Sequence, residues 1–152
     1  MDVKHVNPFV ESFTSVMPEL GFSNVQIGKL SAKGKEISGS GVLVVVGIVG
    51  AVRGNVLYAI ENEAAKQIAS TMMCEAVDEL DETALSAISE LTNMLTAHAA
   101  TSFYSIGIEI DISTPTMLQG ENVSIKMNSD QVLCIELLAD DISVEINVSF
   151  EN

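Results

Sequence analysis

The chain has 152 residues, of which 47% are hydrophobic and 18% are charged. This length and composition exclude a disordered chain and favour one domain with a buried core, residues 1–152. The 21 acidic residues against 7 Lys and Arg give a formal net charge of −14, and such a surface repels phosphate backbones, which argues against DNA, RNA or an anionic membrane as a partner. Solubility alone is an equally good explanation of the acidity.

Cysteine usage and the absence of a long apolar segment indicate a cytoplasmic protein. Cys74 and Cys134 are the only cysteines, and the first residues have neither a basic start nor an apolar stretch. We therefore expect a reduced, cytoplasmic protein without a secretory leader. The longest apolar run, residues 42–52, is far shorter than the roughly 20 residues that span a bilayer, so no membrane insertion is expected. The His and Cys residues lack metal-ligand spacing, so no metal site is expected.

The first 60 residues suggest one helix followed by strands. Apolar residues recur at helical spacing over residues 7–17, and Pro18 is predicted to end this helix. Residues 25–30 alternate as a strand does. Residues 31–41 have the composition of a loop, which can include an edge strand at 36–38.

Two apolar segments and two helices follow. The β-branched segment "GVLVVVGIVG" and the segment "GNVLYAIENE" predict a long hairpin of two central strands. Asn62 is a candidate N-cap for a helix that ends before Asp78. Asp81 is a second candidate N-cap, for the longest helix, which we expect from Glu82 to Tyr104.

After Gly107 the pattern changes to β structure. Strands are expected at 108–113, 123–127, 132–138 and 143–150. The last one alternates, and we expect the face of Ser143, Glu145, Asn147 and Ser149 to be in water. No linker divides the chain. The predicted fold class is α+β, an antiparallel β-sheet with long helices packed on one face.

The longest helix carries an unusual polar face. Helical periodicity puts Ile88, Leu91, Leu95 and Ala99 on a buried stripe. Glu90 and Asn93 then lie almost opposite this stripe, and their neighbours on that face are small or short. These neighbours are Ser86, Ala97, Ala100 and Thr101. A face with so few long side chains allows another protein to approach closely. The alternative is that both are ordinary surface residues, since a Glu-x-x-Asn spacing also arises by chance.

The segment "AISELTNMLTAHA", preceded by "ELDETAL" and by "VLVVVGIVGAVRGNVLYAI", resembles the CheC/CheX/FliY family of bacterial chemotaxis phosphatases. The resemblance implies that Glu90 and Asn93 are the catalytic pair and that the substrate is a phosphorylated CheY-like response regulator. Members with two sites hold the other on the first helix, where this chain has Glu11 and, in place of the amide, Thr14. A single site resembles CheX more than CheC and implies a homodimer.

Hydrolysis of an aspartyl phosphate needs a water molecule in line with the phosphorus more than it needs a strong base. The amide of Asn93 can orient that water, and Glu90 can pair with the Lys that response regulators hold beside the phosphorylated Asp. Mg²⁺ is expected on the regulator, and no cofactor is expected on this chain. The alternative is a non-catalytic module that binds a receiver domain or a flagellar switch component, for which Asn93 would not be needed.

Overall fold

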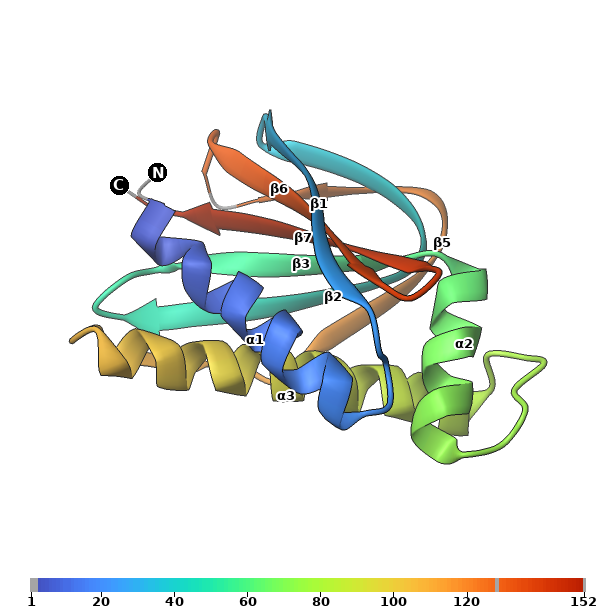
Figure 1. Ribbon diagram of the computed structural model, residues 1–152. Helices are drawn as coiled ribbons and strands as arrows, with labels where there is room; N and C mark the ends of the chain where they lie inside the picture. The colour runs from blue at the N-terminus through green and yellow to red at the C-terminus, as the bar shows by residue number, and fades with distance from the viewer. Residues whose placement is uncertain (1–2, 128, 152) are drawn as a thin grey trace.

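The computed structural model describes residues 3–127 and 129–151, and it has the predicted α+β architecture (Figure 1). A short 3₁₀ turn, Val3–His5, precedes the first helix. The helices are α1 (Asn7–Glu19), α2 (Asn62–Met73) and α3 (Glu82–Ser105). The strands are β1 (Val25–Lys33), β2 (Glu36–Gly50), β3 (Gly54–Ile60), β4 (Ile110–Ile112), β5 (Thr116–Lys126), β6 (Val132–Ala139) and β7 (Ile142–Phe150).

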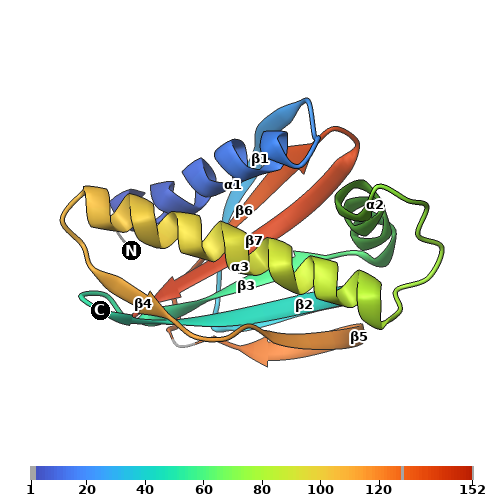
Figure 2. The same ribbon diagram turned by 90° about the horizontal axis from the view of Figure 1, so that it is seen from below.

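The strands form one antiparallel sheet in the order β1-β6-β7-β3-β2-β4. β5 also pairs with β2, along the same side as β4, so the two strands that follow α3 both run along one edge of β2, the longest strand. In Figure 2, seen from below, β4 and β5 follow β2 one after the other, with α3 crossing beside them. This arrangement brings the end of β4 close to the middle of α3.

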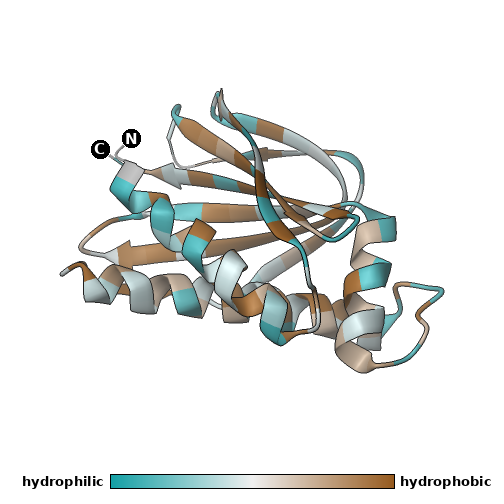
Figure 3. Ribbon diagram, viewed as in Figure 1, coloured by the Kyte–Doolittle hydropathy of each residue, from teal (hydrophilic) through white to brown (hydrophobic). Residues whose placement is uncertain are grey.

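The main core lies between the sheet and the helices α1 and α3, which cover one face (Figures 1 and 2). Apolar and polar residues alternate along several strands (Figure 3), as expected for strands with one face in the core. At one end of this core the rings of Phe9 and Phe150 pack against Phe103 of α3, with centroids 5.8 and 6.2 Å away. The predicted placement of the long helices on one face is confirmed.

Local predictions were wrong at the end of α1, between β1 and β2, and at the start of α2. α1 continues through Pro18 to Glu19, because the φ angle of proline is compatible with a helix and the chain turns only at Gly21, where φ is 109°. The predicted loop at 31–41 is mostly strand, since β1 and β2 are separated only by residues 34–35. The N-cap of α2 is Glu61 and not Asn62, which is the first helical residue.

The outer face of β7 is only partly in water. Ser143 is exposed as predicted, whereas Glu145 is half-buried and Asn147 and Ser149 are buried. The side-chain NH₂ of Asn147 donates to the backbone oxygen of Leu57, and the hydroxyl of Ser149 accepts a hydrogen bond from the backbone N–H of Ser129. A second, smaller apolar cluster covers this side of the sheet: Ile37, Leu43, Leu57, Met127 and Val132. Alternation separated the two faces correctly, but the chain also covers the outer face over the second half of β7.

None of the helices in the described ranges has the length together with the apolar character needed to cross a membrane.

Candidate functional site

The site is built on α3, which is fixed at its start by its N-cap. The carboxylate of Asp81 accepts a hydrogen bond of 2.8 Å from the backbone N–H of Ala84, as predicted. From there the apolar stripe continues along the helix, fully buried against the sheet and α1: Ala84, Ile88, Leu91, Leu95, Ala99 and Phe103. Because this stripe can face only the core, the opposite side of α3 is directed outward.

A buried polar contact fixes the rotation of α3 near its middle. The hydroxyl of Thr96 donates to the backbone oxygen of Thr92 at 2.7 Å and lies 2.8 Å from the hydroxyl of Tyr58 on β3. Since a Thr hydroxyl has a single hydrogen, Tyr58 is the donor in the second contact. Burial raises the pKa of Tyr58, so the phenol keeps its proton. This contact lies one helical turn from Asn93 and ties that part of the helix to the sheet.

Glu90 and Asn93 both lie on the exposed face, as the periodicity predicted. Ser86, Ser89, Glu90 and Asn93 follow one another at helical spacing, so their side chains share one side of the helix. Neither the carboxylate of Glu90 nor the amide of Asn93 has a hydrogen bond or ion pair with another described residue. Both polar groups are therefore available to a visiting molecule.

These residues line a hollow, which the sequence did not reveal. One wall is the polar face of α3, and the other is the chain that leaves β4, residues 112–115. The hollow has a volume of about 460 Å³. The sequence predicted only that a strand ends at residue 113, because nothing in a local pattern shows that the following segment returns to the side of α3.

The second wall is attached to the sheet. The backbone N–H of Ser113 donates to the oxygen of Gly47 on β2 at 2.9 Å, and the N–H of Gly47 donates to the hydroxyl of Ser113 at 2.8 Å. The Ser113 hydroxyl in turn donates to the oxygen of Thr114. β5 then begins at Thr116, which pairs with Val45. Residues 113–115 therefore bridge two paired strands and have little freedom to move away from the sheet.

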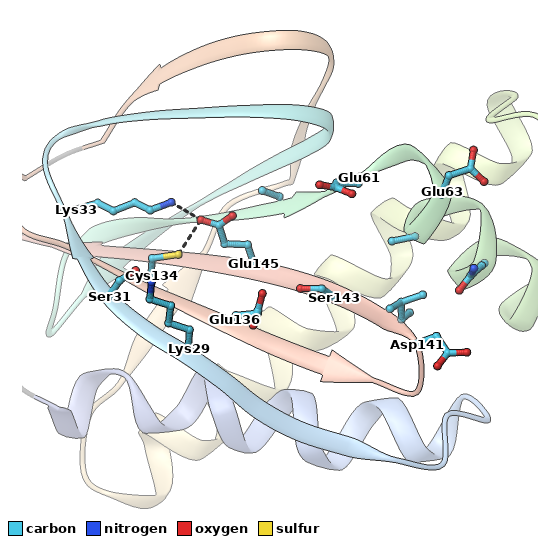
Figure 4. A pocket seen from close by; sticks show the side chains of 14 residues that line it. Lys29, Ser31, Lys33, Glu61, Glu63, Cys134, Glu136, Asp141, Ser143 and Glu145 are labelled. Carbon is cyan, nitrogen blue, oxygen red and sulfur yellow. Dashed lines mark hydrogen bonds and ion pairs between the residues drawn. The ribbon is translucent and has the colours of Figure 1, made fainter.

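The hollow beside α3 differs in charge from a larger one on the other side of the sheet. The larger hollow, of about 510 Å³, lies between β1, β6, β7, the end of β3 and α2 (Figure 4). Lys29 and Lys33 line it together with five carboxylates, and five negative against two positive charges leave an excess of three negative charges. The carboxylates are those of Glu61, Glu63, Glu136, Asp141 and Glu145. The hollow beside α3 has one carboxylate, Glu90, among eight lining residues. A phosphoryl group is repelled less by the hollow beside α3, which makes it the better candidate for a phosphate substrate.

Two charged groups and one thiol of the larger hollow are hydrogen-bonded to one another. The ammonium of Lys33 and the thiol of Cys134 both donate to the carboxylate of Glu145 (Figure 4). Burial, together with the hydrogen bond to Glu145, raises the pKa of Cys134 to about 11, so this thiol is protonated at neutral pH. The pKa of Lys33 is also raised, because the hydrogen bond and charge of Glu145 outweigh burial. We interpret this cluster as structural.

The first helix has no second pair of the same kind. Glu11 and Thr14 are exposed on α1, and the hydroxyl of Thr14 donates to the backbone oxygen of Glu11 at 3.1 Å. A free amide can donate one hydrogen bond and accept another at the same time. The Thr14 hydroxyl has its hydrogen bound to its own helix, so it cannot do both for a partner. The described part of the chain thus carries one Glu-x-x-Asn pair at this helical position, that of α3.

Comparison with known proteins identifies relatives of the whole chain. The family model described as chemotaxis phosphatase CheX matches residues 42–138, which include α3 and both walls of the hollow. Among curated proteins, the CheY-P phosphatase CheX of Thermotoga maritima is 32% identical over 127 residues, which are 83% of this chain and 82% of that protein.

Solved structures agree with this. A CheC-like superfamily protein from Shewanella superposes with a TM-score of 0.88 at 28% identity, over 100% of both chains. A CheX from Borrelia burgdorferi, in a complex with CheY, BeF₃ and Mg²⁺, superposes with a TM-score of 0.84 at 26% identity and covers 97% of this chain and 98% of that one.

Proposed function

Because the chain belongs to the CheX family of chemotaxis phosphatases and is itself a phosphatase, we propose that it hydrolyses the aspartyl phosphate of a CheY-like response regulator, with Asn93 and Glu90 as the working pair. The observation that carries the proposal is the position of these two side chains, which are exposed and unpaired within a hollow that holds one carboxylate. The CheX of known structure with CheY bound supports the choice of partner.

In this proposal Asn93 orients the attacking water. An aspartyl phosphate is a reactive mixed anhydride, so its hydrolysis depends chiefly on a water placed in line with the phosphorus. The carbonyl oxygen of the Asn93 amide accepts a hydrogen bond from this water, while its NH₂ group can donate to a phosphoryl oxygen. A carboxylate at this position would repel the phosphoryl oxygens, which explains the need for an amide.

Glu90 binds the regulator. Its carboxylate lies one helical turn before Asn93 on the same side of α3, and it pairs with the Lys that response regulators hold beside the phosphorylated Asp. This pair sets the position of the regulator, so that the phosphoryl group meets Asn93. The proton of the attacking water passes to solvent or to the phosphate product, because neither step requires a strong base here.

Mg²⁺ remains on the regulator in this proposal. When bound there, it neutralises phosphoryl charge. No group of three or more His, Cys, Asp or Glu side chains among the described residues is arranged to hold a metal ion. In this proposal the regulator supplies the only ion that the reaction needs.

Replacement of Asn93 tests the catalytic role. The protein is mixed with a receiver domain that has been phosphorylated with acetyl phosphate or phosphoramidate, and the loss of phosphate is followed in time. Asn93→Ala should slow hydrolysis on the order of 10²–10³-fold while the complex still forms, because one positioned polar group is lost. Asn62→Ala, an exposed amide on α2, is the matched control and should keep the wild-type rate. An Asn93→Ala protein with wild-type speed would remove the assignment.

Replacement of Glu90 tests docking. Glu90→Ala should raise the regulator concentration that gives half the maximal rate and should also lower the rate, since it removes a charged contact that sets the position of the regulator. Glu11→Ala is the control, because Glu11 is an exposed Glu on a helix without the partner amide. Equal kinetics for the two variants would show that Glu90 does not bind the regulator.

A further inference from the structure

We propose that residues 113–115 form part of the docking surface and that Thr114 is a positioning residue, which contacts the bound regulator from the side opposite Asn93. The inference rests on the proposed function. Glu90 and Asn93 both lie on α3, and residues 113–115 add a second wall to this site. The observation behind it is the shared hollow of about 460 Å³, lined by α3 on one side and by residues 112–115 on the other.

The geometry favours contact with both walls. A regulator that brings its phosphoryl group to Asn93 must place part of its surface within the hollow, since Asn93 and Glu90 line it together with Thr114 and Pro115. Partners that fill a hollow in this way gain contacts on each side of it. The second wall therefore determines how closely, and at what angle, the regulator approaches α3.

The second wall has the properties of a fixed contact surface. Ser113 is bound to Gly47 through its backbone and its hydroxyl, and the ring of Pro115 restricts the backbone two residues later. A Cβ atom at position 47 would lie 3.3 Å from the Ser113 hydroxyl, so glycine at this position leaves room for the wall. A preorganised wall costs little conformational entropy when the partner binds.

In this wall, the hydroxyl of Thr114 is the one available to form a hydrogen bond with the regulator. The hydroxyl of Ser113 is already used in hydrogen bonds with Gly47 and Thr114. Thr114 is exposed, and its side chain has no hydrogen bond with another described residue. It is also uncharged, which matters because a carboxylate on this wall would face the incoming phosphoryl group in an already acidic protein.

The test measures KM and kcat for dephosphorylation of a phosphorylated receiver domain over a range of receiver concentrations. Thr114→Glu should raise KM about fivefold or more by repulsion of the phosphoryl group. Thr114→Ala should raise KM by about two- to tenfold through loss of one hydrogen bond, and Thr114→Ser should restore it. In each case kcat should change less than about threefold, because the water-orienting amide is intact. A purely structural role would not give this pattern of rescue.

Thr14→Glu on α1 is the matched control, an exposed Thr that receives the same charge away from the hollow. It should leave KM unchanged. If wild-type protein is active and all Thr114 variants keep the wild-type KM, the second wall is not a docking surface, although the proposed function stands. If wild-type protein does not dephosphorylate the receiver, or Asn93→Ala is fully active, the proposed function itself fails. Circular dichroism spectra that match wild type establish that each variant is folded.

Discussion

The ionisation of one residue, Glu145, makes the stability of the fold depend on pH. Burial alone would raise the pKa of Glu145, but its hydrogen bonds with Cys134 and Lys33 and the charge of Lys33 outweigh burial, so the pKa lies below its ordinary value. The ordinary pKa of Glu is about 4.3. Glu145 thus stabilises the fold above this pH, and the stabilisation is lost as the pH falls through the lower, folded-state pKa.

Glu145→Gln tests this linkage. Between pH 6 and pH 3 the free energy of unfolding of the wild type should fall more steeply than that of Glu145→Gln, which has no carboxylate to protonate. Urea unfolding at a series of pH values measures both slopes. Glu136→Gln is the control, since Glu136 lies directly opposite Glu145 on β6 and is also half-buried but has no hydrogen bond to Lys33 or Cys134. Identical slopes for wild type and Glu145→Gln would contradict the prediction.

At the scale of secondary structure, α3 depends on its first turn as well as on its buried stripe. Asp81→Ala should lower the free energy of unfolding by about 1 kcal/mol, because the N–H of Ala84 loses its capping acceptor. Asp81→Asn keeps an acceptor at the same position and should lose only a fraction of this. Urea unfolding of the three proteins at neutral pH provides the comparison. A cap that contributes nothing would leave Asp81→Ala as stable as the wild type.

Much of the arrangement of elements was predictable, because helical and strand periodicities are local. The spacing of apolar residues on α3 allows only one side of the helix to face the core, and this predicts both the buried stripe and the outward position of Glu90 and Asn93. The cap at Asp81 was predictable from its residue type. The burial of Asn147 was not predictable, since alternation separates two faces but does not say that a second cluster covers the outer one. Pro18 was misread because the fixed φ angle of proline is helical, so the loss of one N–H donor did not end α1 at this position.

The site was predictable only in part. Glu90 and Asn93 were found because they share one helix, whereas Thr114 comes 21 positions after Asn93 in the sequence and reaches it only because β4 and β5 pair in succession along β2. No local pattern contains this pairing. The roles of Glu90 and Asn93 remain proposals that the kinetic experiments test.

At the scale of the whole molecule, β1 is an outer strand with exposed apolar residues. Among the described residues it pairs with β6 alone, and Ile27 and Leu30 are 57% and 59% exposed. An unprotected edge strand of this kind invites pairing with another chain. We therefore expect that the predicted homodimer forms through β1, and that salt strengthens it, because two copies each with a formal charge of −14 repel one another.

Sedimentation equilibrium tests the dimer. Wild-type protein should sediment as a dimer, and Leu30→Lys should shift it toward the monomer, because a charge would be placed in the apolar contact. Val49→Lys is the matched control, an exposed apolar residue on β2, and should leave the association unchanged. A wild-type protein that is monomeric at all concentrations, or a Leu30→Lys protein that dimerises as strongly as wild type, would exclude this interface.

The two walls of the hollow belong to different layers of the fold, one to a helix packed on the core and the other to a short connection at the edge of the sheet. A substitution at exposed Thr114 therefore leaves the packing of α3 in place. A duplicated gene can exchange this residue and come to prefer a new regulator, while Glu90 and Asn93 are inherited unchanged. In such descendants the choice of regulator would change faster than the reaction that Glu90 and Asn93 perform.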